Sequence, residues 1–177
     1  MRRFKHYKIL GFAALIILVI CRGNAQTYLV GVRGGASFGK NPGNFQEADV
    51  FTGIYLPWLW GYQNGLNLKP RVEGSVGWLN NEGDSAFVGT LGPVLELRKG
   101  NFPVTLEGGV SLSALSRSDF PQRNLGGWFE FTDHAGLNWH ITKSITLGCR
   151  YQHMSNAGFY RHNPGLNLVM LSFGYAF

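Results

Sequence analysis

Apolar and polar side chains alternate along most of the chain from residue 28 onward, with the period of two that is typical of β-strands. Turn-forming residues separate the runs, and no stretch beyond the first 25 residues shows the period of an amphipathic helix. Eight runs can be distinguished, at about 28–33, 48–56, 66–78, 87–97, 104–113, 129–139, 145–152 and 169–177. The second run carries apolar residues on both faces, so its orientation stays open. The sequence therefore predicts an all-β fold of eight antiparallel strands.

The connections between these runs tend to alternate in length. Two are tight, near 99–102 and 141–144. Four are longer or more polar, near 40–47, 80–85, 116–126 and 156–165. The stretch 57–65 (PWLWGYQNG) breaks the alternation. Short turns on one side and longer loops on the other are typical of outer-membrane barrels, in which a tilted strand of about 9–11 residues crosses the bilayer.

Charged side chains in the runs fall on the face opposite the large apolar residues. They are Arg33, Arg71, Glu73, Glu96, Glu107, Glu130 and Arg150. In a small membrane barrel this face lines the lumen, where opposite charges can pair, and the apolar face meets lipid. In a soluble β-sandwich or a lipocalin-like barrel the polar face would meet water instead, and alternation alone does not separate these two cases.

Aromatic residues favour the membrane alternative. The chain closes on LSFGYAF, with Phe173, Tyr175 and Phe177 on one face, which resembles the terminal signature of bacterial outer-membrane barrels. Trp58 and Trp60, with Tyr62, suit an interfacial aromatic girdle. We therefore predict an eight-stranded antiparallel transmembrane β-barrel of the bacterial outer membrane, with both ends periplasmic.

The first 25 residues have the pattern of a cleaved signal peptide. A basic start (MRRFKHYK) precedes an apolar or small run of 13 residues, 9–21, and Gly23-Asn24-Ala25 supplies small residues for cleavage after Ala25. A run of that length is too short for a membrane-spanning helix, which needs about 17–25 residues. We expect residues 1–25 to be removed during secretion, and residues 26–177 to form a single barrel domain.

Removal of this leader changes the interpretation of the charge. The formal net charge is +6, but the leader holds five of the 16 basic residues and no acid, leaving 11 basic against 10 acidic residues. A net charge of +1 gives no reason to expect a nucleic-acid partner. Cys149 alone remains, which excludes an intramolecular disulfide. His134, His140 and His162 lack a metal-ligand spacing, so we expect no metal and no organic cofactor.

Candidate chemistry lies in HMSNAGFYRHNPGLN, residues 153–167. His153 and Ser155 share the lipid-facing parity of the seventh run, with Cα atoms about 6.6 Å apart. A base and a nucleophile facing lipid near the outer rim suit a substrate that is itself a lipid. Asn156 offers an amide donor and Gly158 an accessible backbone N–H, and together these can build an oxyanion hole. The chain has no G-x-S-x-G motif, so we do not expect the nucleophile elbow of an α/β-hydrolase.

The segment RYQHMSNAGFYRHNPGLNL (150–168) resembles the C-terminal active-site segment of the lipid A 3-O-deacylases of the PagL type, which are eight-stranded outer-membrane esterases. FEFTDHAGLNWHI, YLPWLW and the closing GYAF are also similar to that family, most clearly from about residue 128 onward. The resemblance implies Ser155 as nucleophile, His153 as general base, and Asn156 with the Gly158 N–H as oxyanion donors. It implies as substrate the ester-linked 3-hydroxyacyl chain at position 3 of lipid A in the outer leaflet.

The third member of the family's triad is a glutamate, and the matching position here is Asn167. Parity places Asn167 across the last hairpin from His153. An amide oxygen can hold the imidazole tautomer but offers no charge for the imidazolium, and a reversed amide would give the wrong tautomer. Asp133 has the lipid-facing parity of the sixth strand and falls opposite His153. It either supplies the orienting charge or is a solvated residue at the membrane boundary.

Two functions follow from these observations. The first is hydrolysis of an acyl ester of lipid A through an acyl-Ser155 intermediate. The second is a barrel that has lost turnover with Asn167 and binds lipid A or supports the membrane. The expected partners are lipid A or lipopolysaccharide and the surrounding outer-membrane lipid, and a homodimer is left open.

Overall fold

The computed structural model describes residues 27–38, 43–62 and 64–177, so the predicted signal peptide lies outside the described residues. Eight long strands dominate the fold: β1 (Tyr28–Ser37), β2 (Phe45–Tyr55), β4 (Leu66–Asn81), β5 (Asp84–Lys99), β6 (Val104–Leu115), β9 (Phe129–His140), β10 (Ile145–Ser155) and β11 (Leu166–Ala176). Three short strands complete it: β3 (Trp60–Gly61), β7 (Asp119–Phe120) and β8 (Arg123–Asn124). Among the described residues, no helix has the length and apolar character needed to cross a membrane.

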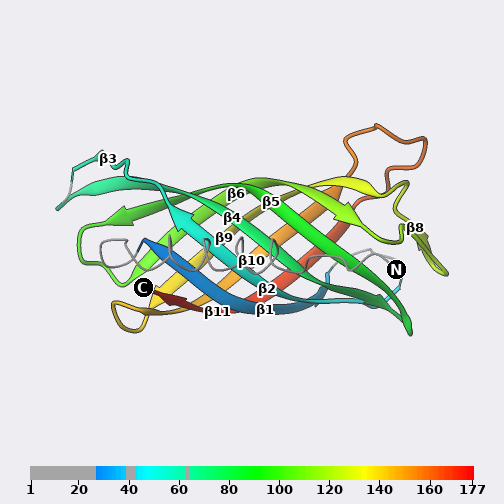
Figure 1. Cartoon of the computed structure of the whole chain (residues 1–177), viewed down its shortest axis with the longest axis horizontal. Coiled ribbons are helices and arrows are strands. Elements are labelled where there is room, and N and C mark those ends of the chain that lie inside the picture. The colour runs from blue at the N-terminus through cyan, green and yellow to red at the C-terminus, as the bar shows by residue number, and fades with distance from the viewer. Residues whose placement is uncertain (1–26, 39–42, 63) are drawn as a thin grey trace, which may run out of the picture.

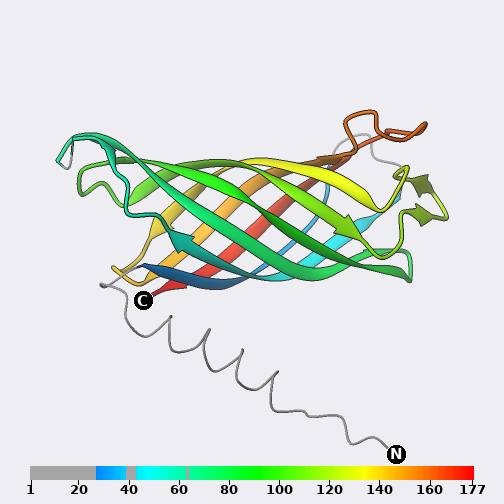
Figure 2. The same ribbon diagram turned by 45° about the horizontal axis from the view of Figure 1, so that its top comes forward.

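The long strands close into an antiparallel barrel. Each pairs with its neighbours in the order β2-β1-β11-β10-β9-β6-β5-β4, and pairing of β2 with β4 completes the ring. Figures 1 and 2 show strongly tilted strands, with the C-terminus and β3 at one end and β8 at the other. Tyr28 and Phe177 exchange backbone hydrogen bonds of 3.0 and 2.9 Å, so the first and last strands meet at the same end. The predicted eight-stranded barrel is confirmed.

Several strands extend about three residues beyond the predicted bounds, since β4 ends at Asn81, β5 begins at Asp84, β10 ends at Ser155 and β11 begins at Leu166. The second strand begins at Phe45, three residues earlier than expected, because inward-facing Phe45 is fully buried. The connection near 80–85, expected to be longer or more polar, is polar but is a tight turn. β4 and β5 continue pairing to Asn81 and Asp84, and only Glu82 (φ 51°) and Gly83 (φ 98°) join them. Two successive positive φ angles give a hairpin turn that matches strand twist, and glycine accepts this geometry without strain.

The outer surface of the barrel is apolar, as the alternation predicted. Val50, Val76, Leu91, Val110 and Leu171 are exposed in the central parts of their strands. Trp58, Trp60 and Tyr62 are exposed near the end of the barrel where β1 begins and β11 ends (Figure 1). A surface of this kind is stable only in contact with lipid, because contiguous exposed apolar area of this extent is unfavourable in water.

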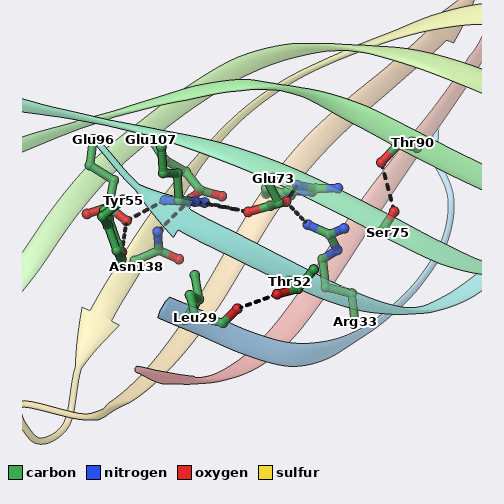
Figure 3. Close-up of polar contacts among 12 residues, drawn as sticks. Leu29, Arg33, Thr52, Tyr55, Glu73, Ser75, Thr90, Glu96, Glu107 and Asn138 are labelled. Carbon is green, nitrogen blue, oxygen red and sulfur yellow. Dashed lines mark hydrogen bonds and ion pairs between the residues drawn. The ribbon is translucent and has the colours of Figure 1, made fainter. Parts of the chain in front are cut away.

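The lumen holds a network of charged side chains, which runs from its middle toward the end where β1 begins and β11 ends (Figure 3). Arg33 contacts Asp49 at 3.0 Å and Glu73 at 2.5 Å. Arg71 lies among three carboxylates, at 2.8 Å from Glu73 and 2.7 Å from Glu107, and it also pairs with Glu96. Arg150 approaches Glu73 at 3.3 Å. The predicted inward placement of these charges is confirmed, and mutual pairing offsets part of their desolvation cost.

The other half of the lumen is filled by a compact apolar cluster that the sequence did not reveal. Its members are Phe45, Leu79, Ala86, Val88, Leu115, Phe120, Leu125, Met154, Leu166, Leu168 and Met170. Met154 lies between His153 and Ser155 in sequence, and Leu166 and Leu168 flank Asn167. Because side chains on a strand alternate in direction, burial of these three residues orients His153, Ser155 and Asn167 outward. The cluster therefore anchors the candidate site from inside.

Candidate active site

His153 lies at the centre of a row of three strands. Its cross-strand partner on β11 is Asn167, and its partner on β9 is Asp133. Both registers were predicted from strand parity and the tight turn at 141–144, and both are confirmed. His153 and Asn167 are half-buried on the outer face, whereas Asp133 is exposed. The described residues show no hydrogen bond between Asp133 and His153, so the orienting role of Asp133 stays a prediction.

The imidazole of His153 is held by Asn167. The Nδ1 atom lies 2.6 Å from the Oδ1 atom of Asn167. Because an amide oxygen only accepts, Nδ1 must carry the proton and donate it, which leaves the Nε2 lone pair available. The hydroxyl of Tyr151 donates to the same oxygen at 2.7 Å. Of the two amide orientations that the sequence left open, the structure shows the one that a general base requires.

Ser155 is the last residue of β10 and faces the same way as His153. Its side chain is half-buried, and its partner on β9 is Phe131. Within the described ranges its hydroxyl forms no hydrogen bond, so it is available for contact with a substrate. The predicted base and nucleophile therefore share one outward face at the loop end of the barrel.

Asn156 directs its side chain between the loop that follows β10 and the connection from β8 to β9. It is fully buried, and its Nδ2 donates to the carbonyls of Leu125 at 3.0 Å and His162 at 2.8 Å. Its Oδ1 accepts the Gly158 N–H at 3.0 Å, and its own N–H donates to Asn163 Oδ1 at 3.0 Å. Both donors predicted for an oxyanion hole are thus engaged within the loop. Their catalytic role stays a prediction that requires an exchange of partners.

Gly165 is a site residue that the sequence analysis missed. It adopts φ +65°, and a Cβ atom at this position would lie 2.7 Å from His153 Cε1 and 3.4 Å from Nε2. The loop thus returns to β11 with bare backbone against the imidazole. The Asn163-Pro164-Gly165 turn was the available signal, because glycine is favoured where φ is positive.

Three aromatic rings form an apolar surface beside Ser155. Phe131 stacks on Phe159 with ring centroids 5.8 Å apart, and Phe129 meets Phe131 edge-on at 5.2 Å. Phe159 belongs to the loop and is 70% exposed. A surface of this kind can hold an acyl chain next to the nucleophile, because aromatic rings contribute large apolar contact area.

A family model and a curated relative match most of the chain. The family model described as lipid A 3-O-deacylase (PagL) matches residues 47–176. The chain belongs to this family. A curated relative, the lipid A deacylase PagL of Bordetella bronchiseptica, is 30% identical over 151 residues, which cover 82% of this chain and 84% of the relative.

Solved structures show the same fold. The crystal structure of the outer-membrane enzyme PagL superimposes with a TM-score of 0.72 at 18% identity, covering 84% of this chain and 99% of that chain. The Neisserial surface protein A matches with a TM-score of 0.55 at 12% identity, covering 88% and 100%. The N-terminal barrel domain of Pseudomonas aeruginosa OprF matches with a TM-score of 0.51 at 12% identity, covering 87% and 100%. This member of the PagL family is therefore an outer-membrane β-barrel.

Proposed function

We propose that the protein is a carboxylic ester hydrolase that removes the ester-linked 3-hydroxyacyl chain at position 3 of lipid A. The observation that carries this proposal is the outward-facing arrangement of His153, Ser155 and Asn167, with the imidazole held at 2.6 Å by an amide oxygen. The arrangement lies on an apolar face beside exposed aromatic rings. Membership of the lipid A 3-O-deacylase family supports the same substrate.

The chemistry follows from these positions. His153 Nε2 takes the proton of the Ser155 hydroxyl while its oxygen attacks the ester carbonyl, giving a tetrahedral oxyanion. Collapse breaks the bond to the sugar oxygen, which takes the proton from the imidazolium, and the acyl chain remains on Ser155. Water then attacks the acyl-enzyme while His153 Nε2 takes its proton. Collapse returns that proton to the Ser155 oxygen and releases the 3-hydroxy fatty acid. Asn167 holds the ring throughout but supplies no negative charge for the imidazolium.

The oxyanion needs donors at the end of β10. Gly158 can serve if its N–H exchanges Asn156 Oδ1 for the substrate oxygen. Asn156 can serve if its Nδ2 exchanges the carbonyl of Leu125 or His162 for that oxygen. Loss of a single oxyanion donor reduces kcat by about 10²–10³ in serine hydrolases. Asn156→Ala should also loosen the loop, since the side chain contacts two loop carbonyls. A matched Asn163→Ala variant, which removes only one loop contact, separates loop order from oxyanion stabilisation.

Two residues compete for the orienting role toward His153. Asn167 contacts the ring directly, and Asp133 lies at the matching register position on the other side. We expect Asn167→Ala to reduce turnover strongly and Asp133→Asn to show whether a carboxylate contributes. Full activity in both variants would exclude both assignments.

The asparagine at position 167 favours the alternative of a barrel without turnover. The position that matches the family's glutamate holds an asparagine, so the charge that stabilises the imidazolium is missing. A barrel with this change that binds lipid A without turning it over would retain the folded loop and the apolar surface. Retention of Ser155, His153 and Asn156 together favours the enzyme.

Mass spectrometry of lipid A from outer membranes that contain the protein tests the proposal, with Ser155→Ala as control. Loss of one 3-hydroxyacyl chain with the wild type alone would establish the deacylase. Unchanged lipid A with both, in membranes where the barrel is folded, would contradict the deacylase and favour the non-enzymatic alternative. Amino-terminal sequencing of the same material tests cleavage after Ala25, and cross-linking in these membranes tests whether the protein forms a homodimer.

A further inference from the structure

Tyr151 contacts the candidate site but has no part in the proposed reaction. It lies two residues before His153 on β10 and faces outward, 43% exposed. Its hydroxyl donates to Asn167 Oδ1 at 2.7 Å, and His153 Nδ1 lies 2.6 Å from the same oxygen. Two donors from one strand thus converge on one amide oxygen of the neighbouring strand. The contact to Tyr151 is diagonal, because the direct cross-strand partner of Tyr151 is Val169.

The orientation of the Asn167 amide decides whether His153 can act as a base. With the oxygen toward the ring, the proton sits on Nδ1 and Nε2 can accept from Ser155. With the nitrogen toward the ring, the amide donates to Nδ1, and the neutral imidazole then carries its proton on Nε2. A wrong tautomer of this kind lowers the kcat of a serine triad by a factor of about 10⁴. A carboxylate has two equivalent oxygens, so either orientation presents an acceptor to the ring. The orientation of the side chain affects the tautomer of His153 only because residue 167 is an asparagine.

We propose that Tyr151 is a positioning residue that selects the productive amide orientation of Asn167. A phenol is a better hydrogen-bond donor than acceptor, so its hydroxyl favours the amide oxygen over the amide nitrogen. An O···O distance of 2.7 Å suits an O–H···O hydrogen bond. The inference rests on the proposed function, because orientation matters only if Nε2 acts as a base toward Ser155. It assigns to Tyr151 a role that a family glutamate would make unnecessary.

The kinetic test compares Tyr151→Phe in two backgrounds, the wild type and Asn167→Asp. A neutral hydrogen bond contributes about 0.5–1.5 kcal/mol, which corresponds to a factor of about 2–10 in the orientation equilibrium. Because kcat follows the productive fraction, and the wild type holds mainly the productive orientation, we expect kcat toward lipid A to fall by up to about twofold with KM unchanged in the wild-type background. In the Asn167→Asp background the loss should be less than half as large. Equal losses in both backgrounds, or no loss in the first, would overturn the proposal.

Tyr175→Phe is the matched control. Tyr175 also faces outward, 47% exposed, near the other end of β11, where its ring stacks on Phe177. Removal of its hydroxyl leaves that aromatic contact in place, so we expect unchanged kcat. A fall in kcat equal to that of Tyr151→Phe would show that loss of any outward phenol affects the barrel, and would contradict a specific role for Tyr151.

A spectroscopic test needs no turnover. ¹⁵N NMR of histidine-labelled barrel at alkaline pH reports the tautomer of each neutral imidazole, and the His153 signals are those lost in His153→Gln. We expect His153 to be protonated on Nδ1 in the wild type and to become a mixture in Tyr151→Phe. An unchanged tautomer would overturn the proposal. A tautomer shift in a barrel that never deacylates lipid A would support the positioning role and reject the proposed function.

Discussion

Replacement of Asn167 by aspartate tests whether the missing charge limits the reaction. The two side chains have nearly the same shape, so Asn167→Asp keeps an oxygen at the position 2.6 Å from His153 Nδ1. The substitution adds a negative charge beside the ring that becomes an imidazolium during acyl transfer. We therefore expect the variant to be faster than the wild type.

The size of the gain follows from the geometry. The imidazolium charge is spread over the ring, so the two charges lie about 4 Å apart and attract by about 4 kcal/mol at an effective dielectric constant of about 20. His153 and Asn167 are both half-buried, and screening by solvent strongly reduces the attraction between charges at such positions. About 1–2 kcal/mol remains for the transition state, which corresponds to an increase of about 5- to 30-fold in kcat.

Release of 3-hydroxy fatty acid from purified lipid A, measured by mass spectrometry with barrel refolded in detergent or lipid, provides the assay. The control is Asn80→Asp, which adds the same charge on β4, near the β4–β5 turn and far along the sheet from His153. An Asn167→Asp variant that is folded and no faster than the wild type would refute the reasoning. Equal acceleration by Asn80→Asp would assign the effect to net charge and not to the contact with His153.

Three further predictions concern the loop, the inner cluster and the lumen. Gly165→Ala should reduce kcat at least tenfold, because the new Cβ would lie 2.7 Å from His153 Cε1, whereas Gly83→Ala carries a similar backbone strain with nothing within 4 Å and should keep activity. Met154→Ala should lower the free energy of unfolding by about 2–5 kcal/mol in guanidinium titrations of the barrel in lipid, because Met154 is buried in the inner cluster. Arg71→Met should destabilise the barrel by about 3–5 kcal/mol, because it leaves Glu73, Glu96 and Glu107 without their shared cation. A similar loss for Arg117→Met, whose partner Asp84 is exposed, would contradict the importance of burial.

The sequence by itself determined the strands and the direction of their side chains. A period of two assigns each residue to one face, and this was enough to place the charges of β4, β5 and β6 inside. The tight turn at 141–144 then fixed the register between β9 and β10, which put Asp133 opposite His153. Parity in the final hairpin put Asn167 on its other side. The row of residues that forms the candidate site was therefore predictable.

Only the tertiary structure decided what those residues contact. Asn156 follows the last strand residue, so strand periodicity did not show that its amide donates into the loop. The contact of Tyr151 with Asn167 runs diagonally between strands, and its existence depends on sheet twist and side-chain rotamers. The apolar cluster beneath the site gathers residues from β2, β4, β5, β6, β10 and β11 and from the β7–β8 region. Alternation is a local property of each strand, whereas these contacts arise only when the sheet closes and the loops fold over its end.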